Sequence, residues 1–146
     1  MKHKNNQENL LLIAWVISLI AMSGSLYFSE VKQFEPCTLC WFQRIVIYPF
    51  TLLLGIALIR KDYGISFYTM ILSAIGTCIS TYHYFIQKVS FVSEHSVSCG
   101  RIPCTGEYIN LLGFITIPFV ALTAFLIILI CSFLSWKQMK KHEMKI

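Results

Sequence analysis

Residues 36–59 of this 146-residue chain read PCTLCWFQRIVIYPFTLLLGIALI, a C-x-x-C motif that runs directly into a long apolar segment. The chain contains four such apolar runs, at residues 10–28, 41–59, 65–86 and 116–136. About 20 helical residues cross the hydrocarbon core of a bilayer, so each run is long enough to span a membrane. The sequence therefore predicts an all-α membrane protein, a four-transmembrane-helix bundle that forms a single domain over residues 1–146.

Charge predicts the orientation of these spans. Hydrophobic residues make up 56% of the chain, and the basic residues gather at the ends of the apolar runs rather than on a face that would bind nucleic acid. Eight basic residues fall in the two terminal segments and the loop between runs two and three: Lys2, Lys4, Arg60, Lys61, Lys137, Lys140, Lys141 and Lys145. By the positive-inside rule, we expect a multi-pass cell-membrane protein with both termini in the cytoplasm. Loops 29–40 and 87–115 then face outward, and each carries a cysteine pair.

The first run could instead be a cleaved signal peptide, because small residues follow its apolar core at Ser23, Gly24 and Ser25. The apolar stretch continues past them to Phe28, which favours a retained helix. In either case the cysteines stay on the same side of the membrane.

The C-x-x-C motif suggests a reactive dithiol. Pro36 fits the first turn of a helix, which would place Cys37 and Cys40 in its opening turn. A helix N-terminus lowers the pKa of a thiol and favours the thiolate, the nucleophile of disulfide exchange. Arg44 lies four residues after Cys40, hence on the same helix face, where its charge would favour a Cys40 thiolate.

Cys99 and Cys104, in the second outer loop, form the other pair. They can close a small disulfide ring, which would be either exchangeable or a staple that stiffens the loop. The two pairs could also be purely structural disulfides, or together form a four-thiolate zinc centre. Thiols on the oxidising outer side of a membrane tend to form disulfides, so we expect no metal.

The electron acceptor of such a dithiol is expected to be a membrane quinone. The chain has no G-x-G-x-x-G motif for a dinucleotide and no pair of histidines placed to hold haem. A quinone head needs a polar donor beside an apolar slot at the membrane surface. Arg44 can supply that donor, and His83, at the outer end of the third run, is a second candidate for the quinone site.

The chain resembles a known family of membrane proteins. Residues 36–44, PCTLCWFQR, are similar to the C-x-L-C-x-x-x-R motif of the DsbB family, which comprises membrane thiol–quinone oxidoreductases. The four apolar runs, the second cysteine pair and residues 112–114 (LGF) match as well, so the resemblance covers nearly the whole chain. The short spacing between Cys99 and Cys104 looks like that of the BdbC-type members from Gram-positive bacteria, and His83-x-x-x-Gln87 is similar to a family motif near the quinone.

The resemblance implies a mechanism with redox-active disulfides Cys37–Cys40 and Cys99–Cys104. A reduced thioredoxin-fold oxidase outside the cytoplasm, of the DsbA or BdbD type, would attack Cys99. Cys104 would then attack Cys37 and release a Cys40 thiolate toward the quinone, which the Gram-positive resemblance suggests is menaquinone, while Arg44 polarises the quinone oxygen. The partner would leave oxidised and place disulfides in secreted proteins.

Three other classes of membrane protein fit the sequence less well. Proteins of the vitamin K epoxide reductase type carry their C-x-x-C in a late helix, the reverse of the order here. Small multidrug transporters need a carboxylate inside a membrane helix, and none of the four runs contains Asp or Glu. The main alternative is a structural or assembly membrane protein with inert disulfides, which only a redox measurement separates from an oxidoreductase.

Overall fold

The computed structural model describes residues 2–33, 36–88 and 117–144. These residues form four helices, α1 (Lys2–Glu30), α2 (Thr38–Arg60), α3 (Ile65–Lys88) and α5 (Ile117–Glu143). Each contains an apolar segment long enough to cross a membrane. The predicted all-helical fold with four membrane spans is thus confirmed, whereas Cys99 and Cys104 lie outside the described residues.

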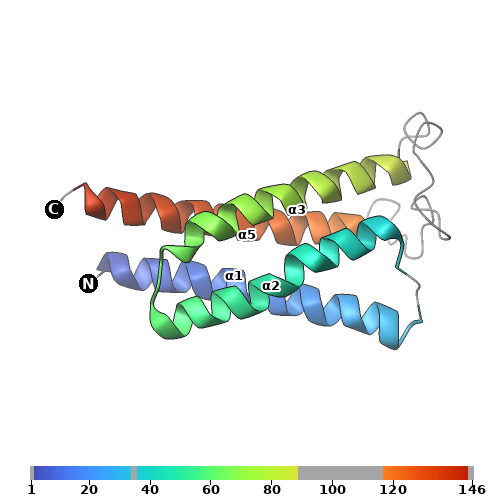
Figure 1. Ribbon diagram of the computed structural model, residues 1–146, viewed down its shortest axis with the longest axis horizontal. Helices are drawn as coiled ribbons and strands as arrows, with labels where there is room; N and C mark the ends of the chain where they lie inside the picture. Colours follow the sequence, from blue (N-terminus) through green and yellow to red (C-terminus); the bar gives the residue numbers. More distant parts are fainter. Residues whose placement is uncertain (1, 34–35, 89–116, 145–146) are drawn as a thin grey trace.

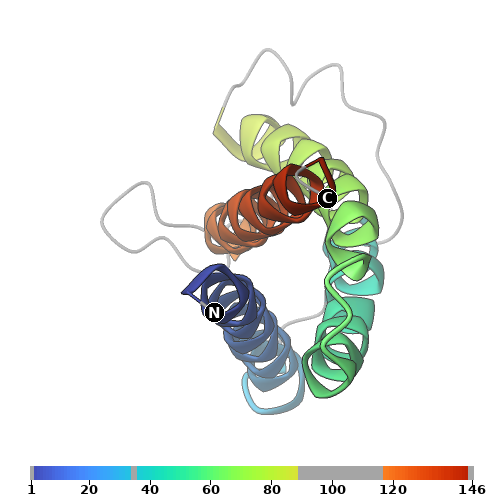
Figure 2. The same ribbon diagram turned by 90° about the vertical axis from the view of Figure 1, so that its left-hand side faces the viewer.

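The helices run alternately up and down, so the two chain termini lie at the same end of the bundle (Figure 1). Neighbouring helices pack in the order α1, α2, α3, α5 and back to α1, and the most extensive of these contacts is between α3 and α5. Figure 2, which looks along the bundle, shows α5 lying beside both α1 and α3. The start of α2, the end of α3 and the start of α5 therefore meet at the end of the bundle away from the termini.

The core is formed by large apolar side chains that face one another across the bundle. Phe50 and Leu54 of α2, Leu11 of α1, and Phe125 and Ile128 of α5 are fully or almost fully buried. Many apolar side chains also point outward, as a helix in lipid requires because hydrocarbon tails solvate them.

The buried face of α3 is polar, unlike those of the other helices. Ser66, Thr69, Ser73, Ser80 and His83 are spaced at intervals of three, four or seven residues, and all are buried. Two interhelical hydrogen bonds of 3.0 Å join this face to α5, from Ser66 to Ser135 and from Thr69 to Ser132. Small and hydroxyl side chains let membrane helices approach closely, which explains the extensive contact between α3 and α5.

A four-residue turn, residues 61–64, joins α2 to α3. Lys61 ends α2 in the left-handed conformation (φ 53°), and the Asp62 amide donates to the Ala57 carbonyl at 3.0 Å. The Asp62 carboxylate then accepts a hydrogen bond from the Gly64 amide at 3.0 Å. These bonds hold the turn in one shape, and so fix how α2 and α3 are aligned.

Candidate functional site

Cys37 and Cys40 lie at the start of α2 but occupy different positions. Cys37 is the N-cap residue, with extended backbone (φ −68°, ψ 169°), and its carbonyl accepts the first helical hydrogen bond from Trp41. Cys40 is in the first turn, and Pro36 stands just before the helix instead of within its first turn. The two cysteines are present as thiols, and Cys37 donates a hydrogen bond to the Cys40 sulfur at 3.3 Å.

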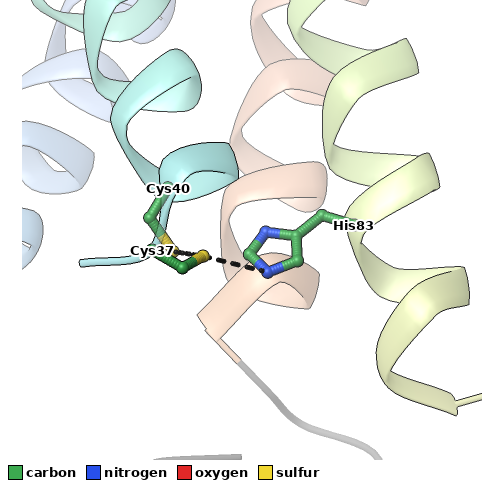
Figure 3. Close-up of side chains that lie close together, drawn as sticks. All are labelled: Cys37, Cys40 and His83. Carbon is green, nitrogen blue, oxygen red and sulfur yellow. Dashed lines mark hydrogen bonds between the residues drawn. The ribbon is translucent and has the colours of Figure 1, made fainter. Parts of the chain in front are cut away.

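His83 reaches this pair from α3. Its Nε2 lies 3.6 Å from the Cys37 sulfur, and its Nδ1 lies 3.3 Å from the Gln43 side-chain amide nitrogen. Figure 3 shows the imidazole ring pointing across the gap between α3 and α2 at Cys37. His83, Cys37 and Gln43 are all buried, so water does not compete for these contacts.

The surroundings of Cys37 favour its neutral form. The hydrogen bond to Cys40, followed by burial, raises the pKa of the Cys37 thiol to about 11, while the hydrogen bond with His83 acts in the opposite direction. Cys37 directly precedes the membrane span that begins at Thr38. At neutral pH it is therefore a thiol, which is a poor nucleophile unless a nearby group removes its proton.

Arg44 is anchored to the last turns of α1. Its guanidinium donates to the Ser25 carbonyl at 2.9 Å and to the Ser29 hydroxyl, and it lies 5.8 Å from the centroid of the Trp41 ring. A cation near a helix C-terminus is favoured by the helix dipole, and a backbone carbonyl oxygen has a second lone pair that can accept the guanidinium hydrogen bond. These contacts explain how one charge is tolerated next to three apolar helices.

A cavity of about 390 Å³ opens beside Cys40 and Arg44. In the part of the chain that the structure describes, its wall is formed by Pro36 and by residues of α1, α2 and α5, most of them apolar. The wall includes Cys40, Gln43 and Arg44, whereas His83 lies against Cys37 and lines no part of it. The cavity is therefore an apolar slot with a thiol and a guanidinium at one end.

Comparison with known proteins bears directly on this site. A family model described as "Disulfide bond formation protein DsbB" matches residues 7–135. The chain belongs to the DsbB family. The chain is 57% identical over 134 residues to "Probable disulfide formation protein C 1" of Bacillus anthracis, covering 92% of this chain and 96% of that protein. It is 50% identical over 125 residues to "Disulfide bond formation protein C" of Bacillus subtilis (strain 168), covering 86% and 91%. No solved structure matches the chain.

Membership of the DsbB family confirms the resemblance on which the sequence interpretation rested. The chain is a multi-pass membrane protein of disulfide-bond formation, a disulfide oxidoreductase. The two thiols and the imidazole of the site lie within 4.8 Å of one another, a spacing that could also suit a soft metal. The DsbB relationship leads us to assign these groups to thiol chemistry instead.

Sequence reasoning missed Gln43 and the two α1 residues that hold Arg44. Gln43 is a polar residue three positions after Cys40 inside an apolar run, and that spacing could have marked it as facing the cysteines. Ser25 and Ser29 carry no comparable signal, because nothing in the sequence aligns the end of α1 with the start of α2.

Proposed function

We propose that this DsbB-family protein oxidises a thioredoxin-fold thiol oxidase outside the cytoplasm and passes the electrons to a membrane quinone. The observation that carries the proposal is the apolar cavity that brings the Cys40 thiol and the Arg44 guanidinium together. Names of relatives such as "Disulfide bond formation protein C" support the disulfide chemistry. The quinone and the partner are inferred from the site and from the family resemblance.

The residues around the cavity fit a quinone. Its volume of about 390 Å³ is within the range of small-molecule pockets, and its wall is largely apolar, as a quinone ring and the start of its isoprenoid tail require. When bound, a quinone would accept two electrons from the thiols. Arg44 would donate a hydrogen bond to its oxygen, and the contacts of Arg44 with Ser25 and Ser29 would hold the guanidinium ready for this role.

The cysteines would act in sequence. We assign to Cys99 the attack by the partner thiolate, and to Cys104 the attack on the Cys37 sulfur. This second exchange would link Cys104 to Cys37 and release Cys40 as the thiolate that faces the cavity. When the partner closes its own disulfide it would release Cys99, which would re-form the Cys99–Cys104 disulfide and free Cys37. Cys37–Cys40 and Cys99–Cys104 would thus be the two redox-active disulfides, and the outgoing partner would carry a new disulfide to secreted proteins.

The same proposal places both termini in the cytoplasm and the two cysteine-bearing loops outside. The basic residues near the chain ends, with Arg60 and Lys61 where α2 meets the turn, support this orientation. Menaquinone is the quinone to test first, because the BdbC-type spacing of Cys99 and Cys104 points to a Gram-positive membrane.

Quinone reduction by purified protein, followed optically with a reduced thioredoxin-fold partner, tests the proposal. Wild type should turn over and Cys40→Ser should be inactive. Arg44→Ala should raise the quinone KM by roughly 10- to 100-fold, since a hydrogen bond to a charged group contributes about 1.5–3 kcal/mol. Arg44→Lys retains the positive charge but lacks the planar guanidinium, so its quinone KM should lie between those of wild type and Arg44→Ala.

The matched control is Cys78→Ser, because Cys78 is exposed on α3 and outside the cavity wall. That variant should behave as wild type. If wild type reduces neither menaquinone nor ubiquinone while its cysteines stay oxidised, the disulfides are inert and the proposal is wrong.

A further inference from the structure

Four buried or half-buried groups form a continuous line of contacts across the α2–α3 interface. The Gln43 amide meets His83 Nδ1 at 3.3 Å, His83 Nε2 meets the Cys37 sulfur at 3.6 Å, and that sulfur meets Cys40 at 3.3 Å. Cys40 alone of the two cysteines lines the cavity. The line begins at Gln43, which borders the cavity, passes through His83 and Cys37, which do not, and ends at the Cys40 thiol, which does. Figure 3 shows the part of the line from His83 to the two cysteines.

We propose that His83 is the base that removes the Cys37 proton when the Cys37–Cys40 disulfide closes, and that Gln43 positions its ring. This inference rests on the proposed function and assigns roles within the same site. It differs from the sequence-based expectation that His83 binds the quinone, because the ring faces the sulfur and not the cavity.

The need for a base follows from the state of Cys37. Closing the disulfide requires the Cys37 sulfur to attack as a thiolate, yet its pKa of about 11 keeps it protonated at neutral pH. Cys37 is 5% exposed, so bulk water has little access to its proton. Of the titratable groups that the structure describes, those within contact of Cys37 are Cys40, which is the electrophile in this step, and His83.

His83 has the properties of such a base. A neutral imidazole carries a lone pair on one of its two nitrogens, and histidine is the side chain that most often serves as a general base. Its Nε2 is already within hydrogen-bond reach of the Cys37 sulfur. No rearrangement of α2 or α3 is therefore needed before proton transfer.

Gln43 suits a ring that gains and loses a proton. A side-chain amide offers both a donor and an acceptor, so Gln43 can pair with His83 Nδ1 whether or not this nitrogen carries hydrogen. The amide nitrogen faces Nδ1 in the structure, and a 180° rotation of the amide would bring its oxygen there instead. With that oxygen accepting from Nδ1–H, the lone pair of Nε2 is directed at Cys37. Gln43 is thus a positioning residue that acts through His83.

In the reaction with 4,4′-dithiodipyridine, the Cys37 sulfur bonds to the Cys40 sulfur, and the bond between Cys40 and the thiopyridine group breaks with its electron pair going to the released thiopyridone. The Cys37 proton moves to His83 Nε2, and the ring afterwards releases it to water, from which the leaving group takes its own proton. In the proposed reaction a quinone would accept this electron pair in place of the thiopyridine group, so the electrons end on the quinone.

The test is made without quinone. In protein whose other four cysteines are replaced by serine, reduced Cys37 and Cys40 react with 4,4′-dithiodipyridine. The first thiopyridone is released when a cysteine attacks the reagent, and the second when the other cysteine closes the disulfide. Mass spectrometry identifies which cysteine holds the reagent between the two releases.

With His83 replaced by Ala or Gln, we expect the second release to slow by about a hundredfold, in line with the usual contribution of general base catalysis. The reagent should then accumulate on Cys40. Gln43→Ala should give a smaller loss and Gln43→Glu should retain much of the rate, because a carboxylate also accepts from Nδ1–H. The matched control is Ser80→Ala, which removes a buried hydroxyl on the same face of α3 that has no hydrogen-bond partner among the described residues.

The alternatives give different results. If both His83 variants close the disulfide at the wild-type rate, or the reagent accumulates on Cys37, the inference is overturned. If closure is unchanged while the quinone KM rises, His83 is a quinone ligand and the proposed function stands without this role. If closure is slow in the His83 variants but the wild type never reduces quinone, His83 is the base and the proposed function is wrong.

Discussion

At the scale of single residues, the two sulfurs of the C-x-x-C motif differ in what surrounds them. Cys37 is buried between Cys40 and His83, whereas Cys40 also borders the cavity with Arg44. One sulfur therefore has access to a proton acceptor and the other to an electron acceptor. This division follows from the N-cap position of Cys37, which turns its side chain toward α3.

The environment of Cys37 predicts how its reactivity depends on pH. Since its pKa is raised from 9.0 to about 11, modification of Cys37 in the reduced protein by methyl methanethiosulfonate should stay slow below pH 9 and rise toward pH 11. Cys40→Ala should move this rise to lower pH, because the hydrogen bond to Cys40 is the largest cause of the increase. His83→Ala should move it to higher pH, since His83 lowers the pKa.

The raised pKa of Cys37 also makes the folding stability depend on pH. A thiol that binds its proton more tightly in the folded state favours folding below pH 9, and this contribution is lost as the pH rises through about 11. Modification of the Cys37 peptide is quantified by mass spectrometry, with Cys78→Ser as the control. Equal shifts in both variants, or a rise centred below pH 8 in wild type, would contradict the assignment.

Part of this site could be predicted from the sequence, and part could not. Contacts within one helix follow from spacing, so Cys40 and Arg44 were expected on one face of α2, and both line the cavity. The contact between Cys37 and His83 joins residues 46 positions apart. It depends on the position of α3 along the axis of α2 and on which face of α3 is turned toward the core. The spacing of residues within one helix determines neither.

At the scale of helices, α3 and α5 are held together by shape as well as by hydrogen bonds. A methyl group built on Gly76 would lie 2.4–2.8 Å from ring atoms of Phe125, far inside van der Waals contact. Phe125 is fully buried and also packs edge-on against Phe50, with ring centroids 6.4 Å apart. The ring therefore has little room to move away from α3.

Gly76→Ala should destabilise the bundle by about 1–3 kcal/mol, the usual cost of overpacking a core. Gly24→Ala is the matched control, because its added methyl meets nothing within 4 Å and an alanine favours helix over glycine. Thermal unfolding in detergent, followed by the loss of helical signal, measures both. A Gly76→Ala protein as stable as Gly24→Ala would show that the α3–α5 contact is looser than described.

The existence of these helices was predictable, and their inner faces were less so. Hydropathy marks the spans because every residue that crosses the bilayer core must be largely apolar. The helices extend beyond the apolar runs, with α1 beginning at Lys2 and α5 reaching Glu143, since backbone hydrogen bonding continues into polar flanks. In lipid the outer face is also apolar, so hydropathy alone does not reveal the buried serines of α3.

At the scale of the whole molecule, the structure places both termini at one end of the bundle and the cysteines of α2 at the other. We predict that a fluorescent protein that folds only in the cytoplasm will be active when fused after Ile146. Alkaline phosphatase, which needs an oxidising compartment, should be inactive at the same position. The opposite pattern would reverse the orientation and put the C-x-x-C on the cytoplasmic side.

The proposed order of exchange concerns two cysteines outside the described residues. With Cys104→Ser, the partner should remain joined to Cys99 as a stable mixed disulfide, because the thiol that would carry the exchange on to Cys37 is absent. Non-reducing gels and peptide mapping identify the link, and Cys78→Ser serves as the control that forms none. A stable link from the partner to any other cysteine would disprove the order.

The short turn between α2 and α3 has a consequence at the opposite end of the bundle. From residues 61–64, both helices run back for about 20 residues, or roughly 30 Å, before Cys37 meets His83. One inserted residue that extended α3 would rotate everything beyond it by about 100° and shift it by about 1.5 Å. The imidazole would then face lipid or α5 instead of the sulfur. The turn therefore works as a spacer for the redox centre: changing its length should impair thiol chemistry on the far side of the membrane while the four spans still form.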